Sequence, residues 1–202
     1  MRSQPRSQLR WLVCLALGVA PLAGAAGQAP PRLAPLTASR VLVLPAQSVT
    51  GSNNSRGWLA RFDSVLTAQL ESRGPGAGWA YAHDAIRYQR QNPSYLTDAR
   101  ALGTHGLSDD RVRENSVLPE PFASRLRAYI GVADARLTLV PVAATFDTTI
   151  SPRVATLRLV VADGRTARVV GVYSVASPYA DVTAAADSLA LQTARLFIAR
   201  SP

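Results

Sequence analysis

Two apolar runs near the end of the chain decide the fold: VATLRLVVA at residues 154–162 and RTARVVGVYSVA at residues 165–176. In both runs apolar residues alternate with other residues, which is typical of β-strands that bury one face. Arg158 lies opposite the apolar face of the first run. Asp163 and Gly164 join the runs and tolerate the positive φ angles of a tight turn, so they predict a two-residue β-hairpin. The residues that share the apolar face of the first run are Leu157, Leu159 and Val161.

The segments on either side of this hairpin extend the pattern. Residues 135–145 begin with apolar side chains on both faces, as expected of a strand inside a sheet. Residues 121–130 carry apolar residues spaced by four and predict a helix that Gly131 closes. Residues 181–199 predict a terminal amphipathic helix.

The first half of the chain starts with another buried strand. The apolar run at residues 41–44 ends at Pro45 and predicts a strand that is parallel to a central neighbour. Residues 47–55 read as a polar loop. Residues 57–73 predict a helix, and residues 79–82 a short strand. We therefore expect an α/β fold with a mixed β-sheet, an antiparallel C-terminal hairpin and covering amphipathic helices. The apolar stripe of the helix consists of Leu59, Phe62, Leu66 and Leu70.

Residues 83–118 are the most polar and least regular part of the chain. Short helices are expected at residues 84–91 and 97–102. The stretch RYQRQNPSY at residues 87–95 interleaves basic and aromatic residues, the types enriched at interface hot spots. We interpret it as a candidate binding site, although a solvated helix followed by a turn explains the same pattern. The candidate binding residues are Arg87, Tyr88, Arg90 and Tyr95.

The first 26 residues have the pattern of a secretory signal peptide. Three arginines precede an apolar run at residues 11–20, which is too short to span a bilayer. Small residues follow, and they predict cleavage between Ala26 and Gly27. Residues 27–39 are rich in Pro and Ala and read as a linker. Residues 40–200 are then expected to form a single α/β domain, exported to the periplasm or beyond, with no integral membrane segment.

Composition and charge narrow the classes of function. Cys14, the only cysteine, lies inside the signal pattern, so we expect neither a disulfide nor a lipid anchor after cleavage. Residues 1–26 hold three of the 22 basic residues and none of the 13 acidic ones, which leaves a net charge of +6. All basic residues are arginines, and they are scattered, so no nucleic-acid partner is expected.

No familiar catalytic or metal-binding set stands out in the sequence. His83 and His105 are far apart and lack a metal-site spacing, so neither a metal nor a cofactor is expected. Residues 106–109 lack the second glycine of a serine-hydrolase elbow. The carboxylates of residues 109–114 are compatible with a glycoside hydrolase, which needs a pair of carboxylates. Capping of a turn explains these residues equally. These carboxylates belong to Asp109, Asp110 and Glu114.

The order of these segments resembles a group of envelope proteins. The strand at residues 40–45, the later GVADARLTL at residues 131–139, the Asp-Gly hairpin within residues 157–172 and the helix at residues 181–199 carry the resemblance. The group comprises the TolB amino-terminal domain, CsgG and the LpoB-type lipoproteins. The resemblance implies an α/β domain that binds proteins or assembles and is not an enzyme. The lipid-anchoring cysteine of CsgG and LpoB is missing here.

Three functions follow as alternatives. The first is a non-enzymatic envelope protein that acts by contact with an envelope protein partner. The second is an exported hydrolase of envelope or extracellular polymers, which would join His83 or His105 to the carboxylates of residues 109–114. The third is a subunit of a larger assembly, which predicts an exposed apolar patch or an unpaired sheet edge. The sequence leaves the oligomeric state open.

Overall fold

The computed structural model describes most of the chain after residue 39. The described residues all belong to one compact unit, residues 31–202. The expected signal peptide (1–26), linker (27–39) and cleavage site at Ala26 and Gly27 lie outside them, as does Cys14, and they stay predictions. The structure describes residues 40–52, 54–73, 78–147, 149 and 153–198.

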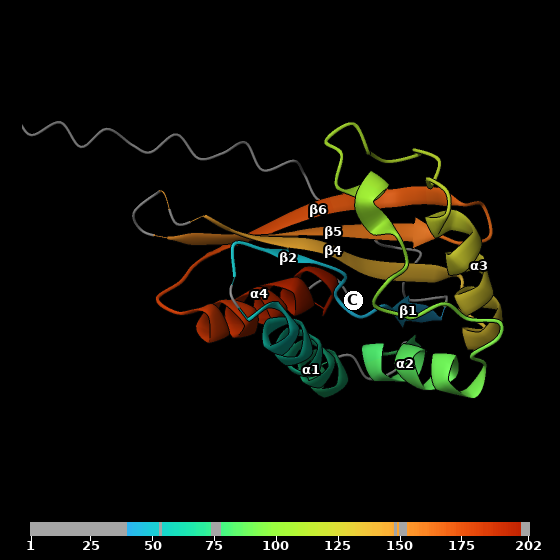
Figure 1. Ribbon diagram of the computed structural model, residues 1–202, viewed down its shortest axis with the longest axis horizontal. Helices are drawn as coiled ribbons and strands as arrows, with labels where there is room; N and C mark the ends of the chain where they lie inside the picture. The colour runs from blue at the N-terminus through green and yellow to red at the C-terminus, as the bar shows by residue number, and fades with distance from the viewer. Residues whose placement is uncertain (1–39, 53, 74–77, 148, 150–152, 199–202) are drawn as a thin grey trace, which may run out of the picture. The chain divides into compact units, whose positions relative to one another are not determined.

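The described residues form a mixed α/β structure, which confirms the predicted fold class (Figure 1). Within the described ranges, six strands, four α-helices and one short 3₁₀ helix follow one another. In chain order they are β1 (Val41–Val43), β2 (Val49–Thr50), α1 (Ser55–Arg73), β3 (Trp79–Ala80), α2 (Ala82–Gln91), η2 (Thr104–Leu107), α3 (Phe122–Ala133), β4 (Leu137–Asp147), β5 (Val154–Asp163), β6 (Arg168–Pro178) and α4 (Val182–Ile198).

All the strands belong to one sheet, in the order β3-β1-β4-β5-β6. β1 is parallel to both β3 and β4, as predicted for the first strand. β4, β5 and β6 are antiparallel neighbours, which confirms the predicted C-terminal hairpin. β2 also pairs with β4, in parallel. Its two residues lie in the segment that the sequence assigned to a polar loop, because a strand this short shows no alternation.

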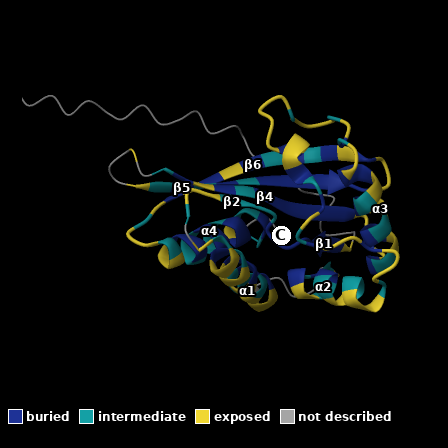
Figure 2. Ribbon diagram, viewed as in Figure 1, coloured by how far each residue is buried: buried dark blue, intermediate teal, exposed yellow. Residues whose placement is uncertain are grey.

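Helices cover both faces of the sheet. The alternation within β1 shows this, because Val41 and Val43 contribute to one apolar cluster while Leu42 and Leu44 contribute to the other. α1 and α4 pack side by side over the first cluster, and α2 and α3 cover the second. Figure 2 shows the resulting pattern, with buried central strands and exposed outer sides of α1, α2 and α4. Each helix is therefore held by its apolar side.

The second helical layer covers only part of its face of the sheet. Towards the β4–β5 turn, a row of small residues crosses four strands, from Thr50 to Thr145, Thr156 and Ala176. The side chains of this row are exposed or half-exposed. We call these residues, with Ser174, the open face. No helix among the described residues packs on it, because the helix-bearing cluster on that side ends near Ala143 and Val172.

The turn between β5 and β6 differs from the predicted two-residue turn. β5 continues through Asp163 and β6 begins at Arg168, so the turn has four residues. The residue with positive φ is Ala167 (51°), not Gly164. Gly164 is needed for another reason, because a side chain there would overlap Cδ1 of Ile130 in α3. The Asp-Gly pair reflects this close approach of helix and turn.

Two helix predictions were also wrong in detail. Residues 97–102 form turns, and the short helix that follows is η2. α3 runs through Gly131 and ends where Asp134 adopts a left-handed conformation with a φ of 47°. The asparagine and aspartate side chains tolerate this conformation better than other side chains, so Asp134 replaces the expected glycine stop.

Within the described residues, none of the helices combines the length and apolar character that crossing a membrane requires.

Candidate functional site

Three of the four candidate binding residues lie on α2. The helix begins where the Asp84 carboxylate accepts a hydrogen bond from the Tyr81 N–H (2.9 Å), which satisfies a backbone group that the helix leaves free. Its buried side consists of Ala82 and Ala85. The opposite side, which carries Arg87, is exposed.

The structure brings Arg87 and Tyr88 together. The Arg87 guanidinium carbon lies 5.5 Å from the centre of the Tyr88 ring, within the range of a cation–π contact. Arg87 also forms an ion pair with Asp84 one turn earlier (2.5 Å). Tyr88 is half-buried and packs against the core under α2. Tyr88 therefore serves the stability of the helix as well as any contact with a partner.

Tyr95 lies on a turn that is anchored on both sides. Before it, the Asn92 side chain donates to the Tyr88 carbonyl (3.0 Å), and the Tyr95 N–H donates to the Asn92 carbonyl (3.1 Å). After it, Leu96 is buried, and the Tyr129 hydroxyl donates to the carbonyl of Thr97 (2.6 Å). The Tyr95 ring itself is 63% exposed. A rigid turn thus presents an aromatic side chain to solvent.

Arg90 is exposed near the end of α2. Within the described part of the chain, its guanidinium forms no ion pair, and no ring contact links it or Tyr95 to Arg87 and Tyr88. The four residues therefore occupy one helix and the turn that follows it, but only Arg87 and Tyr88 touch.

An ion pair that the sequence analysis missed fixes the segment after this turn. The Asp63 carboxylate of α1 accepts a hydrogen bond from the Ala46 N–H (2.9 Å) through Oδ1. Its Oδ2 lies 2.6 Å from Nη2 of Arg100. The Asp63 side chain is only 8% exposed, and this burial raises its pKa to about 6, although the Ala46 N–H and Arg100 both lower it.

Gln47 makes a second connection beside this ion pair. Its side-chain amide donates to the Ala99 carbonyl (2.8 Å), and its carbonyl accepts from the Leu102 N–H (3.2 Å). Residues 99–102 are thus tied to the chain that leaves β1. A sequence signal for Asp63 did exist, because it lies four residues after Leu59, at the edge of the apolar stripe of α1.

A third anchor holds the loop after η2 on the sheet. Arg158 of β5 donates to the carbonyls of Leu107 (2.8 Å) and Asp109 (2.8 Å), and more weakly to that of Val112 (3.3 Å). Its Nη1 also lies 3.4 Å from the Asp110 carboxylate. The sequence placed Arg158 opposite the apolar face of its strand, and the structure shows that this side supports residues 107–112.

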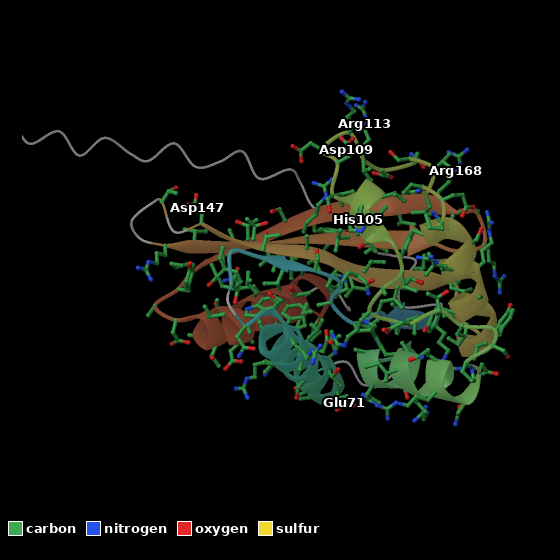
Figure 3. The ribbon with its side chains drawn as sticks, viewed as in Figure 1. Glu71, His105, Asp109, Arg113, Asp147 and Arg168 are labelled. Atoms are coloured by element: carbon green, nitrogen blue, oxygen red, sulfur yellow. The ribbon has the colours of Figure 1, made fainter. Side chains whose placement is uncertain are left out.

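The residues considered for hydrolysis do not form one site. His83 lies on α2, 3.6 Å from Asp84, whereas His105 lies on η2. Figure 3 shows His105 on η2 and Asp109 in the loop that follows it. Asp109 caps a turn by accepting a hydrogen bond from the Arg111 N–H (2.8 Å). Across the described residues, neither histidine bonds to the carboxylates of residues 109–114, and no cluster of three metal-ligating side chains occurs.

Comparison with known proteins finds similarity only to solved structures. No family model matches the chain, and no curated protein matches its sequence. The C-terminal domain of LpoB from Escherichia coli is 16% identical, with a TM-score of 0.45 over 70% of this chain and 83% of that domain. A lipoprotein from Neisseria meningitidis is 15% identical, with a TM-score of 0.40 over 69% of this chain and 80% of the other.

A PelC dodecamer from Paraburkholderia phytofirmans is 12% identical, with a TM-score of 0.37 over 80% of this chain and 89% of the other. LpoB, one of the groups named from the sequence, is therefore among the similar structures. The resemblance to TolB and CsgG stays a prediction. With TM-scores below 0.5, none of these similarities carries an argument about what this chain binds.

Proposed function

We propose that this chain is exported to the cell envelope and acts there, without catalysis, by binding another protein through α2 and the turn that follows it. The observation that carries the proposal is Tyr95, a 63% exposed aromatic side chain on an anchored turn. Among the described residues, only Val117 is an equally exposed large hydrophobic residue.

A rigidly presented tyrosine is a favourable contact residue. It offers a large area with a polar tip, and little conformational entropy is lost when the turn is already ordered. Tyrosine and arginine are both enriched at interface hot spots. The planar guanidinium of Arg90, which forms no ion pair among the described residues, can bind a carboxylate or carbonyl of a partner. Arg87 is held by Asp84, so it is already oriented on the helix surface.

Export rests on the sequence of residues 1–26, with their basic start, short apolar run and small residues before Gly27. Retention in the periplasm and full secretion both agree with this signal.

The proposal is tested by capturing partners from an envelope extract after mild crosslinking. We expect Arg90→Ala and Tyr95→Ala to reduce capture about tenfold or more, which is typical of hot-spot residues. Neither side chain contributes to the core, so the melting temperature should not change. At Tyr88 the variant to use is Tyr88→Phe and not Tyr88→Ala, because truncating a half-buried ring would also destabilise the fold.

The matched control is Arg113→Ala, which removes an exposed arginine from the loop after η2. This variant should capture the same partner as the unchanged chain. Equal capture by Arg90→Ala, Tyr95→Ala and the control would exclude this surface as the binding site.

A further inference from the structure

Four arginines line one end of the sheet, where the β5–β6 turn lies beside α3 (Figure 1). Two backbone hydrogen bonds run across this end: the Arg136 N–H donates to the Arg40 carbonyl (3.1 Å), and the Gly164 N–H donates to the Arg136 carbonyl (3.1 Å). Arg165 follows Gly164 in the turn, and Arg168 begins β6. The four arginines are exposed on adjacent backbone segments. We call Arg40, Arg136, Arg165 and Arg168 the arginine end of the sheet.

The carboxylates at this end compensate only half of the positive charge. The Asp163 carboxylate lies 3.0 Å from Nε of Arg136 and is almost fully buried. The Arg136 side chain remains 52% exposed in this ion pair. Asp134, which ends α3, is exposed. Four arginines and two aspartates leave the arginine end with a net charge of +2.

The other three arginines are available to a ligand. Within the described part of the chain, Arg40 and Arg165 form no ion pair, and the Arg168 guanidinium donates to the Asn115 carbonyl (2.8 Å). Residues 113–118, which run along the start of β6, add one arginine and one glutamate, and so no net charge. Exposed guanidinium groups of this kind bind phosphate oxygens through two parallel N–H donors.

An exposed hydrophobic side chain lies next to these arginines. Val117 forms an isolated β-bridge with Arg168, and it is 67% exposed. Its position is fixed, because the Leu118 N–H donates to the Ala167 carbonyl (2.9 Å). Apolar side chains combined with arginines are typical of surfaces that lie at the boundary between lipid headgroups and acyl chains.

The start of the chain ties this same end to a membrane during export. The expected signal peptide has its apolar run at residues 11–20, and Arg40 is the first described residue. Residues 21–39 between them span at most ~70 Å even when fully extended. While the signal is attached, the arginine end is therefore the end of the domain that is tethered to the membrane.

We propose that the arginine end docks on the headgroups of an anionic phospholipid membrane. The guanidinium groups of Arg40, Arg165 and Arg168 bind lipid phosphates, and Val117 enters the headgroup layer. Each arginine close to an anionic membrane strengthens binding about fivefold, so three of them give a reversible peripheral contact. An acidic protein offers the same charge, but the tether at Arg40 and the exposed Val117 favour a lipid surface.

This inference shares with the proposed function only the expected export. It does not use α2, so Arg90→Ala and Tyr95→Ala should bind lipid vesicles as the unchanged chain does. Capture of an envelope protein, in turn, does not need the arginine end. The two experiments therefore fail separately.

The first test measures binding to vesicles by cosedimentation. It uses residues 27–202, the form expected after export, because the apolar run of residues 1–26 would bind lipid by itself. This form keeps every described helix and strand, and a cooperative thermal transition verifies that it is folded. We expect it to bind vesicles of equal parts phosphatidylglycerol and phosphatidylcholine, but not vesicles of phosphatidylcholine alone. High salt should release it, because salt screens the attraction.

The arginines are tested by a double variant, Arg40→Gln with Arg165→Gln. It should weaken binding to the anionic vesicles about twentyfold, since two groups worth about fivefold each are lost. Neither guanidinium bonds to another described residue, so the melting temperature should not change. The matched control is Arg56→Gln with Arg153→Gln, which removes two exposed arginines near the other end of the sheet. It should bind as the unchanged chain does.

The second test locates the contact. Residues 27–202 contain no cysteine, so a single one can be introduced and labelled. Val117→Cys with an environment-sensitive nitrobenzoxadiazole label should brighten on anionic vesicles, whereas the same label on Arg153→Cys should not.

Several results would overturn the inference. They are equal binding to both kinds of vesicle, an equal loss in the double variant and its control, and a label that brightens at position 153 but not at 117. Absence of binding to either kind of vesicle also overturns it. If the chain then binds polyglutamate and loses this binding with Arg40→Gln and Arg165→Gln, the partner of the arginine end is an acidic protein.

Discussion

Asp63 and Arg100 form an ion pair between α1 and the irregular segment that follows α2, with 2.6 Å between Oδ2 and Nη2. The carboxylate is almost fully buried, while the guanidinium is one-third exposed (32%). The pair lies where the chain leaves β1, because Asp63 also accepts a hydrogen bond from the Ala46 N–H.

The buried Asp63 makes stability depend on pH. Its pKa is raised from 3.8 to about 6 in the folded chain, chiefly by burial. The folded state therefore holds this proton more tightly than the unfolded state does. Its stabilising contribution is fully present below pH 3.8 and is lost as the pH rises through 6. We expect the unchanged chain to lose about 2 kcal/mol more than Asp63→Asn between pH 4 and 7.5.

Urea unfolding of both proteins at the two pH values measures this difference. Parallel pH profiles for Asp63→Asn and the unchanged chain would show that Asp63 titrates normally.

Arg100→Met should destabilise the chain by about 3 kcal/mol at pH 7.5, because it leaves a buried carboxylate without its counter-charge. At pH 4 the cost should be smaller, since Asp63 is then protonated. Arg127→Met serves as the control, because Arg127 is exposed and lies 4.0 Å from Glu120; it should change the unfolding free energy by less than about 0.5 kcal/mol. Equal effects of the two variants would contradict the role of Arg100.

Gly164→Ala should cost about 1–3 kcal/mol, because the added Cβ overlaps Cδ1 of Ile130. Adding Ile130→Val removes that methyl group and should recover part of the loss. Gly131→Ala is the matched control, since no atom lies within 4 Å of the added Cβ. It sits inside α3 and should stabilise the chain by up to about 1 kcal/mol. Thermal unfolding compares the variants, and an unchanged melting temperature for Gly164→Ala would refute the predicted contact.

Arg158→Met should release residues 107–113 from the sheet, because two short hydrogen bonds to backbone carbonyls are lost. Trypsin cleaves after arginine, so cleavage at Arg111 and Arg113 should become about tenfold faster as the open population increases. Arg165→Met removes an exposed arginine and should leave this rate unchanged. If Arg158→Met is cleaved no faster than the control, the loop is held by other contacts.

The strands and main helices were predictable because each shows its burial in a local pattern. The apolar run at residues 41–44 has side chains in both cores, as its lack of alternation indicated. The turn at Gly164 was not predictable in detail, because a side chain there would overlap Ile130, which is distant in sequence. Turn rules consider only residues that are adjacent in the sequence.

The candidate site divides in the same way. Arg87, Tyr88, Arg90 and Tyr95 stood out as a mixed basic and aromatic stretch, and the structure places Tyr95 on an anchored turn. Their binding role stays a prediction. The Asp63–Arg100 pair was missed because it joins segments that share no spacing, and only the fold brings them together.

The central position of β4 has a consequence for how the chain folds. β4, β5 and β6 follow one another in sequence and pair with their neighbours, so this meander closes short loops. β1 and β2 pair only with strands formed later, and Val41 must find Leu137 across most of the intervening chain. β1, the first of the described strands to be synthesised, is thus among the last to be secured. Until β4 arrives, the apolar run at residues 41–44 can pair only with the two-residue strand β3, so it stays exposed to aggregation for most of synthesis.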